Sequence, residues 1–141
     1  MAHEKYQSCI DACNECATAC EHCATECLHE DDVKMMARCI ELDRDCADIC
    51  RFAATLMARG SEEAIHICEH CAEVCRRCAM ECRKHDMQHC QECADACERC
   101  AEECERMAGQ SEGKSGETRS KRQTSGRTAT VSSSARATRA R

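Results

Sequence analysis

Proline and tryptophan are absent from this 141-residue chain, which also has one tyrosine, one phenylalanine and five glycines. Without proline, nothing in the sequence forces a helix to break. No run of 18 apolar residues occurs, which excludes a membrane-spanning helix. The first residues, Met1 to Tyr6, lack the apolar segment of a signal peptide. We therefore expect a cytoplasmic protein that does not bind to a membrane.

Cysteine is the residue present in excess, with 19 copies. In a short secreted chain such a content is typical of a disulfide scaffold. Here the number is odd, no export signal is found, and the cysteines lie in helical rather than loop-rich sequence. In a reducing compartment this pattern indicates metal binding or redox chemistry. We expect the thiols to be free.

Charge divides the chain into two parts. Residues 1–108 carry 12 Lys and Arg against 24 Asp and Glu, whereas residues 109–141 carry 8 Lys and Arg against 2 Glu. Val131 is the one large aliphatic residue of the second part. A segment of this composition cannot bury enough apolar surface to offset the entropy of ordering. We expect a folded domain over 1–108 and a disordered basic tail over 109–141.

One motif, C-x-x-C-A-x-x-C-x-x-C-A-x-E-C, occurs three times, over residues 13–27, 68–82 and 90–104. Its cysteines alternate in spacing between three and four, which is the spacing of the core positions of a heptad. Cys9 extends the first copy. The spacing predicts three helices whose core positions are all thiols. Alanine after every second cysteine lets neighbouring helices approach closely.

A further helix is predicted between the first and second copies. Its core stripe comprises Met35, Cys39, Leu42, Cys46, Ile49, Ala53 and Leu56, with Cys50 beside it. Asp31 or Asp32 can cap its start, Gly60 can end it in a left-handed conformation, and Ser61 can cap the next helix. We expect helices at about 4–29, 32–59, 62–84 and 87–107. Their short connections predict an all-α, antiparallel up-down-up-down four-helix bundle.

This topology gives the bundle two different ends. Tyr6, Phe52, Leu56, Met57, Ile65 and Met107 should gather at one end as an apolar plug. The opposite end should gather the imidazole and thioether side chains of His29, Met35, Met36, His85, Met87 and His89. Because imidazole and thioether groups are metal ligands, we expect metal ions to enter at this second end.

The thiol columns favour cuprous copper. Residues three or four apart on a helix have Cβ atoms about 5–6 Å apart, too far for an unstrained disulfide. A metal ion bound by two sulfurs requires only that these sulfurs lie about 4.5 Å apart. Soft thiolates favour Cu(I), zinc or iron–sulfur clusters, and Cu(I) is content with two or three sulfurs. The predicted ligands of multiple Cu(I) ions are Cys9, Cys13, Cys16, Cys20, Cys23, Cys27, Cys39, Cys46, Cys50, Cys68, Cys71, Cys75, Cys78, Cys82, Cys90, Cys93, Cys97, Cys100 and Cys104, with Met36, His85 and His89.

Other interpretations remain open. The thiols could serve redox chemistry or hold zinc or iron–sulfur clusters, although no cysteine pair is set apart by a helix N-terminus or an adjacent cation. No cysteine stands alone beside a base, so an enzyme is not indicated. The basic tail suggests a nucleic-acid-linked copper sensor, but the acidic body and the lack of aromatic residues in the tail argue against a nucleic-acid partner. Buried thiols could also be simple packing residues.

Over about residues 6–107 the sequence resembles the cytosolic copper storage proteins. The most specific stretches are 31–50, D-D-V-K-M-M-A-R-C-I-E-L-D-R-D-C-A-D-I-C, and 84–94, K-H-D-M-Q-H-C-Q-E-C-A. The resemblance implies a homotetramer of bundles, each storing many Cu(I) ions, with copper entering at the His/Met end. A copper-donor protein or a small thiol would be a further partner. Met87 stands where a histidine is expected in many relatives.

Overall fold

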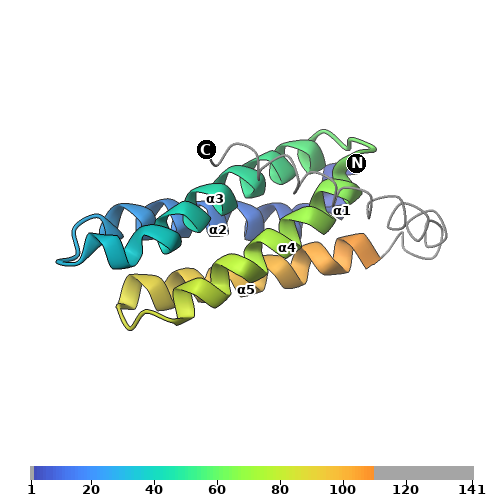
Figure 1. The fold of residues 1–141 in the computed structure, drawn as a ribbon. Coiled ribbons are helices and arrows are strands. Elements are labelled where there is room, and N and C mark those ends of the chain that lie inside the picture. The colour runs from blue at the N-terminus through green and yellow to red at the C-terminus, as the bar shows by residue number, and fades with distance from the viewer. Residues whose placement is uncertain (1, 110–141) are drawn as a thin grey trace, which may run out of the picture. The chain divides into compact units, whose positions relative to one another are not determined.

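A computed structural model describes residues 2–109 of the chain. Its elements are α1 (Ala2–Lys5), α2 (Gln7–Cys27), the 3-10 helix η1 (Val33–Met36), α3 (Ala37–Ala58), α4 (Ala64–Arg83) and α5 (Gln88–Gly109) (Figure 1). The domain predicted over 1–108 corresponds to this helical part. The predicted disordered tail lies, from residue 110 onward, outside the described residues.

The four long helices form an antiparallel bundle. Helix α2 packs against α3 and α5, and α4 packs against the same two helices. Consecutive helices run in opposite directions, with the α2–α3 and α4–α5 connections together at one end (Figure 1). The predicted up-down-up-down bundle is thus confirmed. In residues 2–109 no helix has both the length and the apolar character that a membrane span requires.

The helix boundaries follow local signals in the sequence. The carboxylate of Asp32 accepts a hydrogen bond from the Met35 backbone N–H at 3.3 Å, as predicted for a cap. Gly60 has a φ of 65°, the left-handed conformation that ends a helix. Ser61 Oγ accepts a hydrogen bond from the Glu63 N–H just before α4. Two details differ from prediction: the first helix is interrupted at Tyr6, and a 3-10 turn precedes α3.

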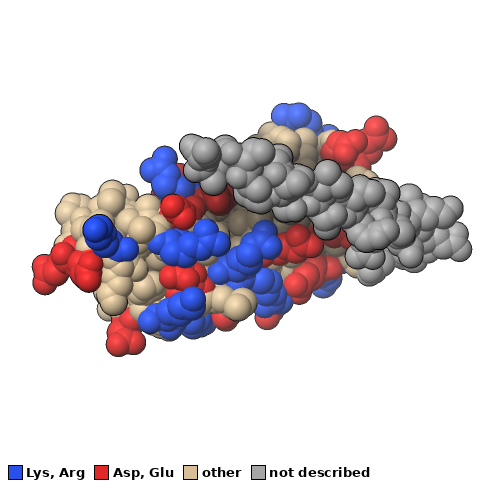
Figure 2. Space-filling view, viewed as in Figure 1, with Lys and Arg blue, Asp and Glu red and all other residues tan. Residues whose placement is uncertain are grey.

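The core of the bundle is built from small side chains. Its buried residues are mainly cysteine and alanine, with few larger ones such as Ile10, Leu42, Leu56 and Val74. Alanine and cysteine occupy little volume, so the helices can lie close together while their thiols meet at the centre. The polar residues between them face outward, and Lys and Arg alternate with Asp and Glu on the face shown in Figure 2.

Two predicted core residues are instead exposed. Phe52, expected in the apolar plug, is 51% exposed, because it follows Cys50 by two residues and so lies on the outer side of α3. Met35, expected in the core stripe, is 62% exposed. In the 3-10 turn residues three apart share a side, so Met36 rather than Met35 is aligned with Cys39 and is buried.

Candidate metal centre

All 19 predicted cysteine ligands lie in the interior of the bundle. Each has an exposed fraction of 0%, and each is a free thiol. They come from all four long helices: six from α2, three from α3, five from α4 and five from α5. The heptad spacing explains this burial, because every third and then fourth residue returns to the same side of a helix.

The thiols are in mutual contact along the length of the core. Neighbouring Sγ atoms lie 3.6 to 4.0 Å apart, and most of these contacts join different helices. Cys16 contacts Cys46 and Cys97, and Cys50 contacts Cys71, Cys75 and Cys100. The result is a column of buried sulfur atoms with lateral contacts at several levels.

Several sets of four thiols could each hold a metal ion. Within each set, the sulfur atoms lie within 4.8 Å of one another. One set is Cys16, Cys46, Cys50 and Cys75, a second is Cys16, Cys20, Cys46 and Cys97, and a third is Cys20, Cys78, Cys93 and Cys97. The first and second of these sets share Cys16 and Cys46, and the second and third share Cys20 and Cys97. Such sharing suits ions joined by bridging thiolates better than separate closed zinc sites.

The observed separations allow low coordination numbers. With metal–sulfur bonds of about 2.3 Å, sulfurs are about 3.8 Å apart in a tetrahedral site, about 4.0 Å in a trigonal one and about 4.6 Å in a linear one. The column can therefore hold three-coordinate ions with almost no rearrangement, and two-coordinate ions if the sulfurs move apart by less than about 1 Å. Tetrahedral sites fit the distances as well, so distance alone does not select the metal.

His89 lies at one end of the column, as predicted. Its Nδ1 is 3.5 Å from both Cys23 Sγ and Cys90 Sγ, and its Nε2 is 2.9 Å from Glu30 Oε2. In a neutral ring that donates Nε2–H to this carboxylate, Nδ1 is the lone-pair nitrogen, and it faces the two sulfurs. The ring is thus oriented to bind a metal ion together with Cys23 and Cys90.

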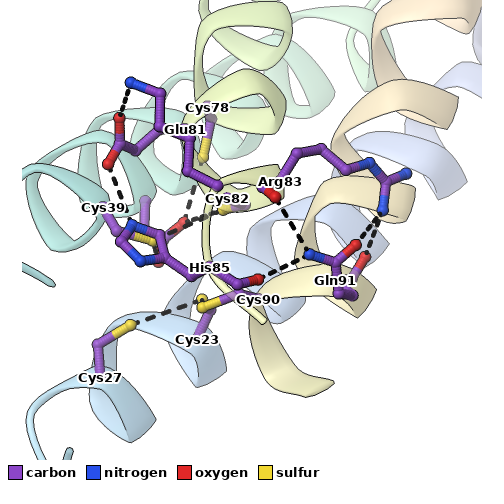
Figure 3. A network of polar contacts seen from close by, with 12 residues as sticks. Cys23, Cys27, Cys39, Cys78, Glu81, Cys82, Arg83, His85, Cys90 and Gln91 are labelled. Atoms are coloured by element: carbon purple, nitrogen blue, oxygen red, sulfur yellow. Dashed lines mark hydrogen bonds and ion pairs between the residues drawn. The ribbon is translucent and has the colours of Figure 1, made fainter. Parts of the chain in front are cut away.

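His85 lies at the same end on a comparable support (Figure 3). Its Nε2 is 3.1 Å from Glu81 Oε2, one turn earlier in the chain. Gln91 Nε2 donates to the His85 backbone oxygen at 2.7 Å, and Arg83 donates to the side-chain oxygen of Gln91 at 2.9 Å (Figure 3). These contacts fix the α4–α5 connection, and with it the position of the His85 ring.

The other side chains predicted at this end are placed less uniformly. Met36 is buried, one turn before Cys39, and Met87 is half-buried against the core. His29 and Met35 are exposed. Among described residues, the group at the end of the thiol column therefore consists of Met36, His85, Met87 and His89 rather than all six predicted side chains.

Asp43 is a core residue that was not predicted. It has an exposed fraction of 0%, and three thiols donate to its Oδ1: Cys78 at 3.2 Å, Cys93 at 3.3 Å and Cys82 at 3.5 Å. Its position was nevertheless visible in the sequence, four residues after Cys39 and three before Cys46. Asp43 occupies the place of a thiol in the α3 column.

Burial governs the protonation of this interior. It raises the pKa of Asp43 to about 11, and the adjacent sulfurs of Cys93 and Cys78 act in the same direction. Burial likewise raises the pKa of Cys27 and that of Cys90, the latter to about 12. At neutral pH Asp43 in the metal-free core is therefore a protonated carboxyl group, and Cys27 and Cys90 at the histidine end are protonated thiols. Metal binding by these thiols must release protons.

The chain matches the family model described as copper storage protein over residues 2–109. The chain belongs to the copper storage protein family. No curated protein sequence matches it.

Solved structures of copper storage proteins resemble this chain closely. The Cu(I)-bound protein BsCsp3 is 49% identical, with a TM-score of 0.70 over 72% of this chain and 96% of that one. The cytosolic copper storage protein of Streptomyces lividans, in a form with five coppers, is 35% identical, with a TM-score of 0.73 over 77% of this chain and 95% of that one. A structure of the Streptomyces lividans protein loaded with 10 copper equivalents is 36% identical, with a TM-score of 0.72 over 75% and 85% of the two chains. These relatives bind copper within the same fold.

The buried carboxyl group predicts a pH dependence of the metal-free protein. The pKa of Asp43 is higher in the folded chain than the value of about 3.9 in an unfolded one. The folded state therefore binds the extra proton from about pH 4 upward, and the contribution of Asp43 to the free energy of unfolding falls as pH rises, by at most about 1.4 kcal/mol per pH unit. Asp43→Asn cannot titrate. Its melting temperature relative to the parent should rise between pH 5 and pH 8.

Thermal unfolding of the reduced, metal-free parent and Asp43→Asn proteins measures this difference. The contributions of thiol titration are common to the two proteins and cancel when their melting temperatures are subtracted. Asp45→Asn, an exposed substitution on the same helix, is the matched control and should run parallel to the parent. Parallel curves for Asp43→Asn as well would show that Asp43 is not held protonated in the core.

Proposed function

We propose that this copper storage protein sequesters many Cu(I) ions along the thiol column of its core. The observation that carries the proposal is the burial of all 19 thiols, most of which lie 3.6 to 4.0 Å from another sulfur atom. Family membership supports it, since relatives are described as Cu(I)-bound. The protein acts as a binding protein rather than an enzyme.

Copper suits this column better than zinc because of how the thiols are shared. Cu(I) accepts two or three sulfurs, and one thiolate can bridge two ions. Zinc in structural sites takes four ligands in a closed tetrahedron. Overlapping sets such as those joined by Cys16 and Cys20 would force separate zinc sites to compete for ligands. The same overlap lets bridged Cu(I) ions fill the column continuously.

The first prediction concerns capacity. The reduced protein should bind about one Cu(I) per cysteine, because two-coordinate ions that share bridging thiolates balance at that ratio. Titration against a competing Cu(I) chelator, with the thiols counted in parallel, measures it. Saturation at about four or five ions would instead indicate separate tetrathiolate sites of the zinc type.

We propose that copper enters at the end that carries His85, His89, Met36 and Met87. There His89 Nδ1 already contacts two thiols, and Glu81 and Glu30 hold the two imidazole rings. Much of the surface at this end carries neither basic nor acidic side chains (Figure 2). The opposite end is closed by Tyr6, Met57 and Met107, which are buried and carry no charge. A cation entering at that end would lose hydration before meeting any charged or imidazole side chain.

The second prediction tests this route. Replacing His85 and His89 by alanine and Met36 and Met87 by leucine should slow both copper loading and chelator-driven removal, on the order of tenfold, the effect typical of disturbing the surroundings of a metal ligand. Final capacity should fall by about one or two ions, because the thiol column remains. Stopped-flow loading measures the rates.

The matched control is the double variant His66→Ala and His70→Ala, since both histidines are exposed on α4 away from the column. It should load at the parent rate. If the quadruple variant loads at the parent rate, and larger side chains substituted at the Tyr6 end slow loading, then copper enters at the Tyr6 end and the proposal is wrong.

We further propose that the protein is a cytoplasmic homotetramer that receives copper from a donor protein or a small thiol. The cytosolic Streptomyces lividans relative supports the location. The exposed aromatic ring of Phe52, in a surface groove on α3 and α4 that also has charged residues in its lining, supports association, because aromatic residues are enriched at subunit interfaces. A single-chain mass by light scattering would contradict the tetramer.

A further inference from the structure

The core column of α3 continues past its last cysteine. Spacings of three and four lead from Cys50 to Ala53 and then to Met57 near the end of the helix. At this end α2, α4 and α5 contribute the thiols Cys9, Cys68 and Cys104, with Cys9 Sγ 3.7 Å from Cys104 Sγ. Helix α3 has only the methyl group of Ala53 before Met57. The sulfur that α3 can offer here is the thioether of Met57.

Met57 is directed toward the thiols. Its Sδ lies 3.6 Å from Cys68 Sγ, and both residues have an exposed fraction of 0%. Long side chains on a helix lean toward its N-terminus, so a residue in the last turn of α3 reaches back into the column. Cys68 also interacts with Cys9 and Cys104. The thioether therefore extends the sulfur column by one ligand at the end away from the histidines.

The thioether of Met57 restricts the kind of metal ion that can bind at this end of the column. It is a soft, neutral ligand that suits Cu(I), whereas a hard or borderline ion gains little from it. Unlike a thiol, it has no proton to release when the metal binds. Cys68 would supply the thiolate and lose its proton, and Met57 would supply a second sulfur without adding negative charge to a closed, water-poor site.

We propose that Met57 Sδ and Cys68 Sγ form a terminal site for a soft monovalent cation, Cu(I) or its analogue Ag(I), at the closed end of the column. The proposal rests on the proposed storage function. It assigns Met57, which the sequence placed in an apolar plug, a role as ligand. Met107 provides the contrast: it is buried at the same end, yet makes no sulfur contact of this kind among the described residues.

A direct test uses the full chain with methionine methyl groups labelled with carbon-13 and the spin-½ silver isotope as Ag(I). A scalar coupling passes only through bonds, so a silver–proton correlation to the Met57 methyl group reports coordination rather than proximity. The substitutions Met57→Leu and Met107→Leu assign the two resonances. The expected result is a correlation for Met57 and none for Met107. Loaded protein without the Met57 correlation would overturn the proposal.

Copper affinity gives a second measurement. Leucine replaces methionine at similar volume, so the fold should tolerate both variants. Competition with a Cu(I) chelator should show the most weakly held ion bound about tenfold less tightly in Met57→Leu, a loss of about 1.4 kcal/mol, and unchanged in Met107→Leu. Equal losses in the two variants would mean a packing effect and contradict the site.

These outcomes are separable from a failure of the storage function. A parent protein that takes up neither silver nor copper would refute storage itself, and the terminal site with it. A parent that fills its column while the Met57 methyl group stays uncoupled and Met57→Leu binds as the parent does would refute the terminal site alone.

Discussion

Contact between buried thiols is the constraint on which this structure depends. A cysteine side chain is small and apolar enough to pack in a helical core, and its sulfur becomes a strong soft ligand once the proton is lost. Placing it at successive core positions of four helices gives a column in which neighbouring sulfurs lie 3.6 to 4.0 Å apart. That spacing requires the close helix approach that the alanines of the repeat permit. The same atoms thus provide the packing and the binding site.

The two ends of the column differ because the residues that close it differ. At the α4–α5 connection, His85 is hydrogen-bonded to Glu81 and His89 to Glu30, and His89 Nδ1 lies 3.5 Å from the sulfurs of Cys23 and Cys90. At the other end, Tyr6, Met57 and Met107 cover the last thiols without offering charge or imidazole. A cation can exchange ligands step by step at the first end, whereas at the second it meets a neutral, tightly packed layer. The proposed loading from one end rests on this difference.

The regular part of the structure could be predicted from the sequence, because a three-and-four spacing of cysteines fixes which side of each helix is buried. The helices, their antiparallel order and the burial of all 19 thiols were obtained in this way. Phe52 was assigned wrongly because it was grouped by its position along the bundle rather than by its side of α3. Met35 was assigned to the core by α-helical spacing to Cys39, whereas residues 33–36 form a 3-10 turn that buries Met36 instead. Asp43 was missed because an acidic residue was assumed to face solvent, although its spacing from Cys39 and Cys46 placed it in the core. The supporting contact of His89 comes from Glu30, 59 positions away, which no local pattern reveals.

We propose that the metal-loaded core holds one array of Cu(I) ions bridged by thiolates. X-ray absorption at the copper edge of the fully loaded protein distinguishes this array from separate sites. We expect Cu(I) with two or three sulfur neighbours at about 2.2–2.3 Å and a clear copper–copper component from ions that share thiolates. Four sulfur neighbours per ion with no copper–copper component would show isolated tetrathiolate sites and would rule out a bridged array.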